Sequence, residues 1–189
     1  MGTENETVFT LDQAIERLGL TRAQVYRQMK DGGIKATKVD GGPRFSEKDL
    51  LALEEVLKKK QTDLAEALDR WLATLGERLT AGGVQELPEV ADGTPEERTA
   101  EVVRRIILLG IVEGAADIHI DPLTKGSRLL WRRGGALKET GRLEPALSDP
   151  VKAGLKTSAG ITDPEQTAAT FVHSHNDHAY QIRLKVAPT

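Results

Sequence analysis

The sequence predicts an α+β fold class, built as two modules joined by a long helix. Three observations predict it. Ser or Thr followed three residues later by Gln, Asp or Glu precedes several apolar runs of helical period. Short alternating segments bounded by glycine occur in both halves, and the composition changes sharply near residue 82. A chain of 189 residues is long enough for two small domains.

Composition narrows the classes of function. The chain has no cysteine, which excludes disulfides, zinc–thiolate sites and cysteine nucleophiles. Its first residues, MGTENETVF, lack the basic and then apolar stretches of a signal peptide. No apolar run reaches the roughly 20 residues of a membrane span. We therefore expect a cytoplasmic protein without membrane insertion.

Two short helices are expected in the first 33 residues. The first follows Thr10 and Gln13, a pair spaced to form a helix capping box. Gly19 is placed to end this helix in the left-handed conformation. The apolar residues of this helix share one face: Leu11, Ala14, Ile15 and Leu18. The second helix begins at the Thr21/Gln24 box, buries Val25 and Met29, and stops at Asp31-Gly32-Gly33.

A hairpin and a long helix follow. Ile34, Ala36 and Val39 alternate before the turn residues Asp40-Gly41-Gly42, and the chain returns through Arg44-Phe45. From Ser46, paired with Asp49, a helical pattern runs along one apolar stripe: Leu50, Leu53, Leu57, Leu64, Leu68, Trp71, Leu72, Leu75 and Leu79.

The sequence leaves open which segment packs against this apolar stripe. Gln61-Thr62-Asp63 could break the pattern into two helices. The stripe could pair with a second copy, giving a homodimer through residues 46–80, or it could fold back as a helical hairpin within the monomer.

The rest of the chain predicts a second α+β domain. Gly, Pro and acidic residues at 82–94 indicate a linker, so we expect a first domain at 8–60, a helical connector at 61–81 and a second domain at 95–189. The first helix of this second domain is expected to begin at Pro95, after the capping pair Thr94 and Glu97, and to end near Gly114. We expect strands at 117–120, 128–132, 136–140, 169–172 and 180–186, mostly antiparallel, with a helix at 145–157.

Positive charge is concentrated in residues 17–48, where eight Lys and Arg against three acidic residues leave +5. The second helix offers Arg22, Gln24, Arg27 and Gln28, side-chain types that pair with guanine or adenine edges in a major groove. Lys38 and Arg44 on the hairpin could neutralise phosphate. These residues predict binding to double-stranded DNA. A solvated pair of helices with ordinary surface charge is the alternative.

Residues Phe9 to Leu53 resemble the excisionase and MerR-type winged helix-turn-helix family. The likeness is carried by Leu-Gly-Leu-Thr at 18–21, Val25-Tyr26-Arg27, the glycines at 32 and 33, and Arg44-Phe45. The resemblance implies a wing made by the hairpin. It also implies that DNA is faced by Arg22, Gln24, Tyr26 and Arg27, with Arg44 against the backbone.

Residues 97 to 189 resemble the non-catalytic domain that precedes the motor in type II secretion and type IV pilus assembly ATPases. The run from Gly114 to Pro122, GAADIHIDP, matches that family's helix-to-strand junction most specifically. The resemblance implies a domain that packs beside an ATPase core, as a partner protein, with arginines that help to sense nucleotide. Arg132 and Arg183 occupy matching positions.

Two departures limit that second resemblance. After Ala159-Gly160 the family's run of arginines and Pro-Gln-Asp-Gly is replaced by QTAATFVH. No G-x-x-x-x-G-K-[ST] loop occurs, so we expect no ATP hydrolysis by this chain. The chain ends where the family's motor would begin, which makes it either a stand-alone unit reused for binding or a fragment of a longer protein.

Other residues could carry chemistry. His173, His175 and His178 surround an expected turn with Asp177, as weak candidates for binding zinc or nickel; the alternative is a polar turn, and we assign no metal and no cofactor. Asp117 and Asp121 alternate with His119 without a nucleophile, so no catalytic residue is expected.

Three hypotheses follow. The first is a DNA-binding regulatory or accessory protein with a C-terminal protein-interaction module. The second is the non-catalytic N-terminal portion of a secretion or pilus ATPase that acts in protein assembly. The third is a small enzyme or metal protein centred on the histidine turn.

Overall fold

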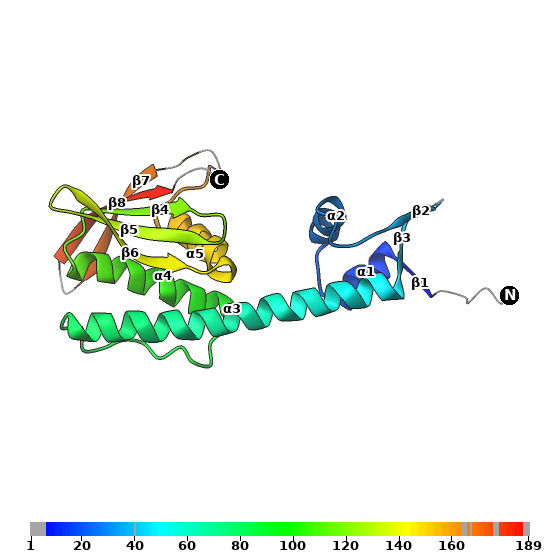
Figure 1. Cartoon of the computed structure of the whole chain (residues 1–189), viewed down its shortest axis with the longest axis horizontal. Coiled ribbons are helices and arrows are strands. Elements are labelled where there is room, and N and C mark those ends of the chain that lie inside the picture. Colours follow the sequence, from blue (N-terminus) through cyan, green and yellow to red (C-terminus); the bar gives the residue numbers. More distant parts are fainter. Residues whose placement is uncertain (1–6, 40, 164–165, 167, 176–177, 187–189) are drawn as a thin grey trace. The chain divides into compact units, whose positions relative to one another are not determined.

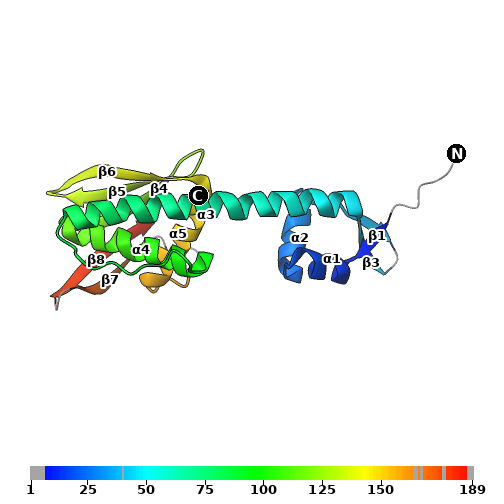
Figure 2. The ribbon, with the colours of Figure 1, turned by 90° about the horizontal axis from the view of Figure 1, so that it is seen from below.

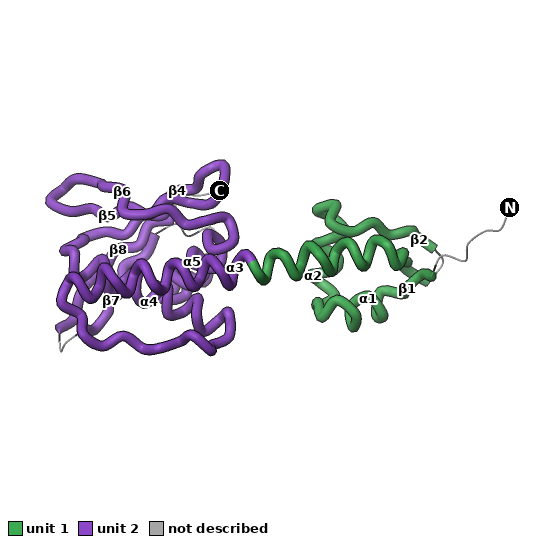
Figure 3. The backbone as a smooth tube through the Cα atoms, turned by 60° about the horizontal axis from the view of Figure 1, so that its bottom comes forward, with its two compact units in different colours: residues 1–62 green, residues 63–189 purple. Residues whose placement is uncertain are grey.

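The computed structural model describes residues 7–39, 41–163, 166, 168–175 and 178–186, and its fold class is α+β. The chain forms two compact units, residues 1–62 and 63–189 (Figure 3). Among the described residues, no helix combines the length and apolar character needed to cross a bilayer.

Unit 1 contains two short helices, α1 (Leu11–Leu18) and α2 (Arg22–Lys30), as the sequence predicts (Figure 1). Both have the expected reciprocal capping boxes, at Thr10 and Thr21. Gly19 ends α1 with a φ of 62°, in the left-handed region that glycine enters without a steric penalty. The turn between the helices therefore occupies only three residues.

A three-stranded antiparallel sheet completes unit 1, in the order β1–β3–β2. The expected hairpin is β2 (Thr37–Val39) and β3 (Gly42–Ser46), although Asp40 of its turn lies outside the described residues. The strand β1 (Val8–Thr10) is not predicted, because three residues show no alternation by themselves. The core of unit 1 consists of Leu11, Ala14, Val25, Ile34, Phe45, Leu50 and Leu53.

The helix α3 (Glu47–Ala81) is continuous, so of the two alternatives for residues 61–63 the structure has the unbroken helix. Its apolar stripe is buried inside the chain rather than left open. Leu50 and Leu53 lie in the core of unit 1, and the stretch from Leu64 to Leu79 lies in or against that of unit 2. The partner of this stretch is α4 (Pro95–Val112) of the same chain, but the two helices run parallel and so do not form the helical hairpin considered above. Arg98 donates to the Ala65 carbonyl near the start of α4, and Val112 lies beside Gly82 at its end.

Unit 2 is a two-layer arrangement of helices on a five-stranded sheet (Figures 1 and 2). The strands follow the predicted segments closely: β4 (Asp117–Pro122), β5 (Ser127–Arg133), β6 (Ala136–Leu143), β7 (Ala168–His175) and β8 (His178–Val186). Their order is β6–β5–β4–β8–β7. All neighbours are antiparallel except β4 and β8, which run parallel because α5 (Pro145–Ser158) lies on the connection between them.

The two faces of this sheet differ in chemistry. Ile118, Trp131 and Leu184 point into the core with α4 and α5, and Trp131 is only 1% exposed. Alternation along the strands puts the polar residues of β4 on the opposite face, beginning with Asp117 and His119.

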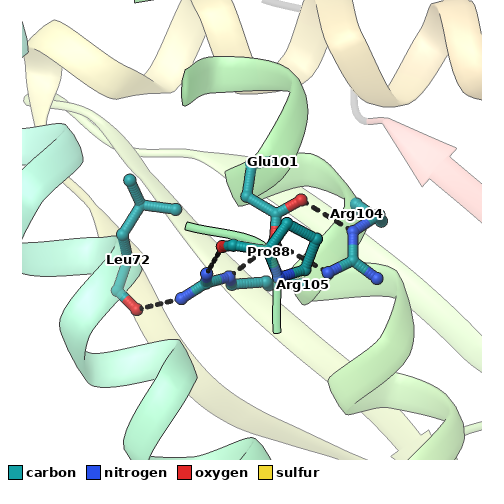
Figure 4. Close-up of polar contacts among 5 residues, drawn as sticks. All are labelled: Leu72, Pro88, Glu101, Arg104 and Arg105. Atoms are coloured by element: carbon teal, nitrogen blue, oxygen red, sulfur yellow. Dashed lines mark hydrogen bonds and ion pairs between the residues drawn. The ribbon is translucent and has the colours of Figure 1, made fainter. Parts of the chain in front are cut away.

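Residues 63–94, nearly all of the segment expected as a connector helix and a linker, are instead part of unit 2. Val84, Leu87 and Val90 pack against the core. The buried Arg105 on α4 explains this attachment (Figure 4): its guanidinium donates to the Pro88 carbonyl at 2.8 Å and to the Leu72 carbonyl at 2.7 Å. The Glu101 carboxylate accepts from both Arg105 and Arg104. The Gly- and Pro-rich composition of residues 82–94 did not predict these contacts, because the residue that makes them, Arg105, lies outside that segment.

Candidate nucleic-acid interface

The helix α2 exposes most of its surface. Val25 is fully buried and Met29 is partly buried against the core of unit 1. Arg22 and Arg27 are exposed, and Tyr26, a large aromatic residue, is 47% exposed. The helix is thus held by one apolar side and presents cationic and aromatic groups on the others.

Gln24 is exposed, but its amide oxygen is already engaged. The Thr21 backbone N–H donates to Gln24 Oε1 at 2.7 Å, and the Gln24 N–H donates back to Thr21 Oγ1 at 3.3 Å. A bidentate contact with adenine needs both the oxygen and the nitrogen of the amide. A contact of Gln24 with adenine would therefore compete with the capping box for the amide oxygen.

Three predicted residues meet around one hollow of about 420 Å³ in unit 1. Arg22 and Tyr26 reach it from α2, and Arg44 reaches it from β3. The remaining lining residues come from the start of α1 and from the hairpin: Thr10, Leu11, Asp12, Gly41, Gly42 and Pro43. A recess with two guanidinium groups and a phenol can receive an anionic group, such as a backbone phosphate.

Arg44 is held centrally because β3 is the middle strand of the sheet. Thr10 of β1 and Thr37 of β2 lie opposite it on its two sides. One guanidinium nitrogen, Nη1, also donates to the Pro43 carbonyl at 3.3 Å. The backbone around Arg44 is therefore fixed from both directions.

Lys38 and Arg27 do not join this hollow. Lys38 lies opposite Pro43, one position along from the Arg44–Thr37 pair, so strand alternation puts Lys38 on the other face of the hairpin. Arg27 is exposed on α2 but does not line the recess. Of the residues predicted to contact DNA, the structure thus brings together Arg22, Tyr26 and Arg44.

Not all of the predicted positive charge is available to a ligand. Arg17 donates to Glu54 at 2.6 Å, lies 3.7 Å from Glu47, and stacks over the Phe9 ring. The hydrogen bond from Arg17 lowers the pKa of the Glu54 carboxyl. Arg17 therefore joins α1 to α3, and the charge count over residues 17–48 overstates the free cationic surface.

Asp12 is the functional residue that sequence reasoning missed. It lines the hollow, and its carboxylate accepts from Arg22 at 2.6 Å. An acidic residue in the first turn of a helix is usually explained by the helix dipole, so its type and position gave no sign of this contact.

In unit 2, Arg132 and Arg183 converge on one buried carboxylate. Asp117 on β4 is 3% exposed and lies opposite Arg132 of β5 and Arg183 of β8. Arg183 Nε lies 2.5 Å from Asp117 Oδ1, and Arg132 Nε lies 2.8 Å from Oδ2. The hydrogen bond from Arg183 holds the pKa of Asp117 below its usual value against the opposing effect of burial, and the charge of Arg183 and the hydrogen bond from Arg132 add to it.

The other polar residues of β4 are Asp121 and His119. Asp121 accepts from Arg128 at 3.1 Å, so both carboxylates of this strand face arginines rather than each other. His119 is 9% exposed and its Nε2 has no hydrogen-bond partner among the described residues. Burial lowers the pKa of His119, which keeps the imidazole neutral at pH 7.

The three histidines near the second hairpin share one face of the β7–β8 pair. His175 lies opposite His178, and His173 lies two residues from His175 on the same strand. Burial, and then the charge of Arg104, lowers the pKa of His173. Asn176 and Asp177 lie outside the described residues. Within the described ranges, no three His, Asp or Glu side chains are grouped as a metal site requires.

Comparison with known proteins gives no match to a family model, to a curated protein or to a solved structure. The function must therefore be inferred from the residues and their geometry.

Proposed function

We propose that unit 1 is a winged helix-turn-helix module that binds double-stranded DNA, with α2 in the major groove and the β2–β3 hairpin as the wing. The order of two short helices, a tight turn and a hairpin supports this assignment. On this proposal the chain is a cytoplasmic regulatory or accessory protein that acts by binding rather than by catalysis. Unit 2 is its protein-interaction module, related to the non-catalytic domain of secretion and pilus ATPases.

The observation that carries the proposal is the hollow shared by Arg22, Tyr26 and Arg44. A phosphate seated there would be contacted from the recognition helix and the wing at once, which fixes the position of the module on the duplex. Arg27, exposed on the same helix, is then the residue best placed to read a base edge, since Gln24 is engaged in its capping box.

The test is DNA binding by the full chain, measured by fluorescence anisotropy with a random double-stranded oligonucleotide at several salt concentrations. We expect affinity to fall linearly with salt on logarithmic axes, because phosphate contacts release counterions. Replacing Arg22 and Arg44 together with alanine should weaken binding at least tenfold and reduce the salt slope by about 2.

Lys59→Ala is the matched control. Lys59 is an exposed cation on α3, away from α2 and the hairpin, so its loss should leave the affinity nearly unchanged. Failure of the wild-type chain to bind DNA even in dilute salt, or an equal effect of all these substitutions, would refute the proposal.

A second function, the non-catalytic portion of a secretion or pilus ATPase, is favoured by the placement of Arg132 and Arg183. They flank Asp117 on adjacent strands of one sheet face, directly after the α4–β4 junction that carries the resemblance. Stable co-purification with a motor domain, combined with no retention of DNA at low salt, would make this function the better one.

A further inference from the structure

The two edges of the sheet in unit 2 are protected very differently. At one edge, β6 contains a bulge in which Thr140 is the extra residue, between Glu139 opposite Leu130 and Gly141 opposite Leu129. Arg78 of α3 donates to the Thr140 carbonyl at 3.1 Å and to its hydroxyl at 2.8 Å. This edge is therefore irregular and its exposed carbonyl is already paired.

The same edge is also covered and charged. The Trp71 ring of α3 lies so close to Gly141 that a Cβ there would come within 3.1 Å of it. Lys138, Glu139 and Arg142 add charges along the strand. Bulges, coverage and charges are the devices by which proteins prevent further strand pairing.

In the part of the chain that the structure describes, the opposite edge, β7, has none of these devices. Its eight residues, AATFVHSH, include no Lys, Arg, Asp, Glu or Pro, and they pair in unbroken register with β8. Val172, in the middle of the strand, is 65% exposed. Among the described residues, one side chain donates to the β7 backbone: Gln166 Nε2 bonds the Ala168 carbonyl at 2.9 Å, at the very start of the strand.

We infer that β7 pairs antiparallel with β7 of a second copy of this chain, so that the two sheets become one. An antiparallel pair of identical strands has a twofold axis perpendicular to the sheet, which keeps the helices of both copies on the same face. Such pairing requires residues of like face to lie opposite each other. A twofold centred on Val172 satisfies that requirement.

The strand is complementary to itself in this register. Val172 would lie against its own counterpart, which covers the exposed side chain in both copies. Thr170 would face Ser174, hydroxyl against hydroxyl, and Phe171 would face His173, ring against ring. The strand carries no carboxylate or ammonium group to repel an identical strand, and burial lowers the pKa of His173, which keeps that imidazole neutral at pH 7. These features favour a second copy over a charged peptide as the occupant.

The test is the oligomeric state of the full chain, measured by sedimentation velocity over a wide range of concentrations at neutral pH. We expect a monomer–dimer equilibrium. Val172→Lys places a charge at the centre of the proposed pairing and should raise the dimer dissociation constant at least tenfold. Because Val172 is mostly exposed, the variant should keep the wild-type circular dichroism spectrum.

Leu137→Lys is the matched control, since Leu137 is 40% exposed on the other edge strand, β6. It should leave the dimer intact. Hydrogen exchange provides a second measurement: amides of residues 168–175 should become more protected as concentration rises.

Three results would overturn the inference. They are a wild-type chain that stays monomeric at every concentration, a dimer that Val172→Lys leaves intact, and a dimer whose β7 amides gain no protection. Loss of the dimer on substitution of Leu51, an exposed residue of α3, with Val172→Lys silent, would instead assign dimerisation to the long helix.

Discussion

Arg22, at the start of α2, donates a hydrogen bond to the carboxylate of Asp12 on α1, with 2.6 Å between Nη2 and Oδ1. Both side chains are largely exposed and both line the hollow that also contains Arg44. If DNA binds as proposed, a phosphate beside Arg22 would compete with this carboxylate for the guanidinium. Asp12 is therefore a built-in competitor for the proposed DNA contact.

Asp12→Asn should strengthen DNA binding at low salt by about two- to fivefold, because it frees Arg22 and removes a negative charge near the duplex. The gain should vanish at high salt, where exposed charges are screened. Anisotropy titrations would measure this change. Glu16→Gln, an exposed carboxylate of α1 outside the hollow, should give a smaller effect; an equal effect would mean that only net charge matters.

Asp117→Asn should destabilise unit 2 by about 1–3 kcal/mol at pH 7, because it weakens the charge-assisted bonds from Arg183 and Arg132 to a buried carboxylate. Since the folded pKa of Asp117 is depressed, this stabilisation is fully present above the unfolded pKa of about 4. It is lost as pH falls through the folded pKa.

Urea unfolding of the wild type and Asp117→Asn at pH 7 and in acid measures this difference. The gap in unfolding free energy should be constant near neutrality and should shrink in acid. Asp121→Asn serves for comparison, because Asp121 is more exposed than Asp117 and its ion pair is with one arginine rather than two, so the loss should stay below about 1 kcal/mol. A gap that does not depend on pH would contradict the role assigned to Asp117.

Arg105→Met should cost about 3–5 kcal/mol, because it leaves the buried Glu101 with one cationic partner and removes the hydrogen bonds to the Leu72 and Pro88 carbonyls. It should also release residues 82–94, which limited proteolysis would detect as new cleavage near Pro88. Arg104→Met removes a more exposed partner of the same carboxylate and should cost less. Equal losses would argue against a clamp at Arg105.

Gly19→Ala should destabilise unit 1 by about 1 kcal/mol, because alanine must adopt a φ of 62°. A Cβ at Gly19 would contact nothing within 4 Å, so the cost arises from the backbone alone. Thermal unfolding followed by circular dichroism would measure it. Asn at the same position should be better tolerated than Ala, since Asn enters the left-handed region more readily.

The sequence predicted most helices and strands because their signals are local. Thr10, Thr21 and Thr94 cap helices through residues three positions away, and Gly19 ends α1 through its own φ. Each of these helix ends depends on residues close in the sequence, so periodicity and residue type are enough to predict it.

Contacts between distant segments were not predictable in this way. The attachment of Pro88 depends on Arg105, and the bond between Asp12 and Arg22 joins two separate helices. For the candidate site, residue types identified Arg22, Tyr26 and Arg44, but only the fold shows that Lys38 lies on the other face of the hairpin and that Gln24 is engaged by Thr21.

Both tryptophans of the chain, Trp71 and Trp131, belong to unit 2, where one lies against Gly141 and the other is buried in the core. Intrinsic emission excited at the red edge of the indole band thus follows residues 63–189 alone. Far-ultraviolet ellipticity follows the helices of both units. Comparing the two signals during a single titration would reveal whether the halves of the chain melt together or in sequence, without any added label.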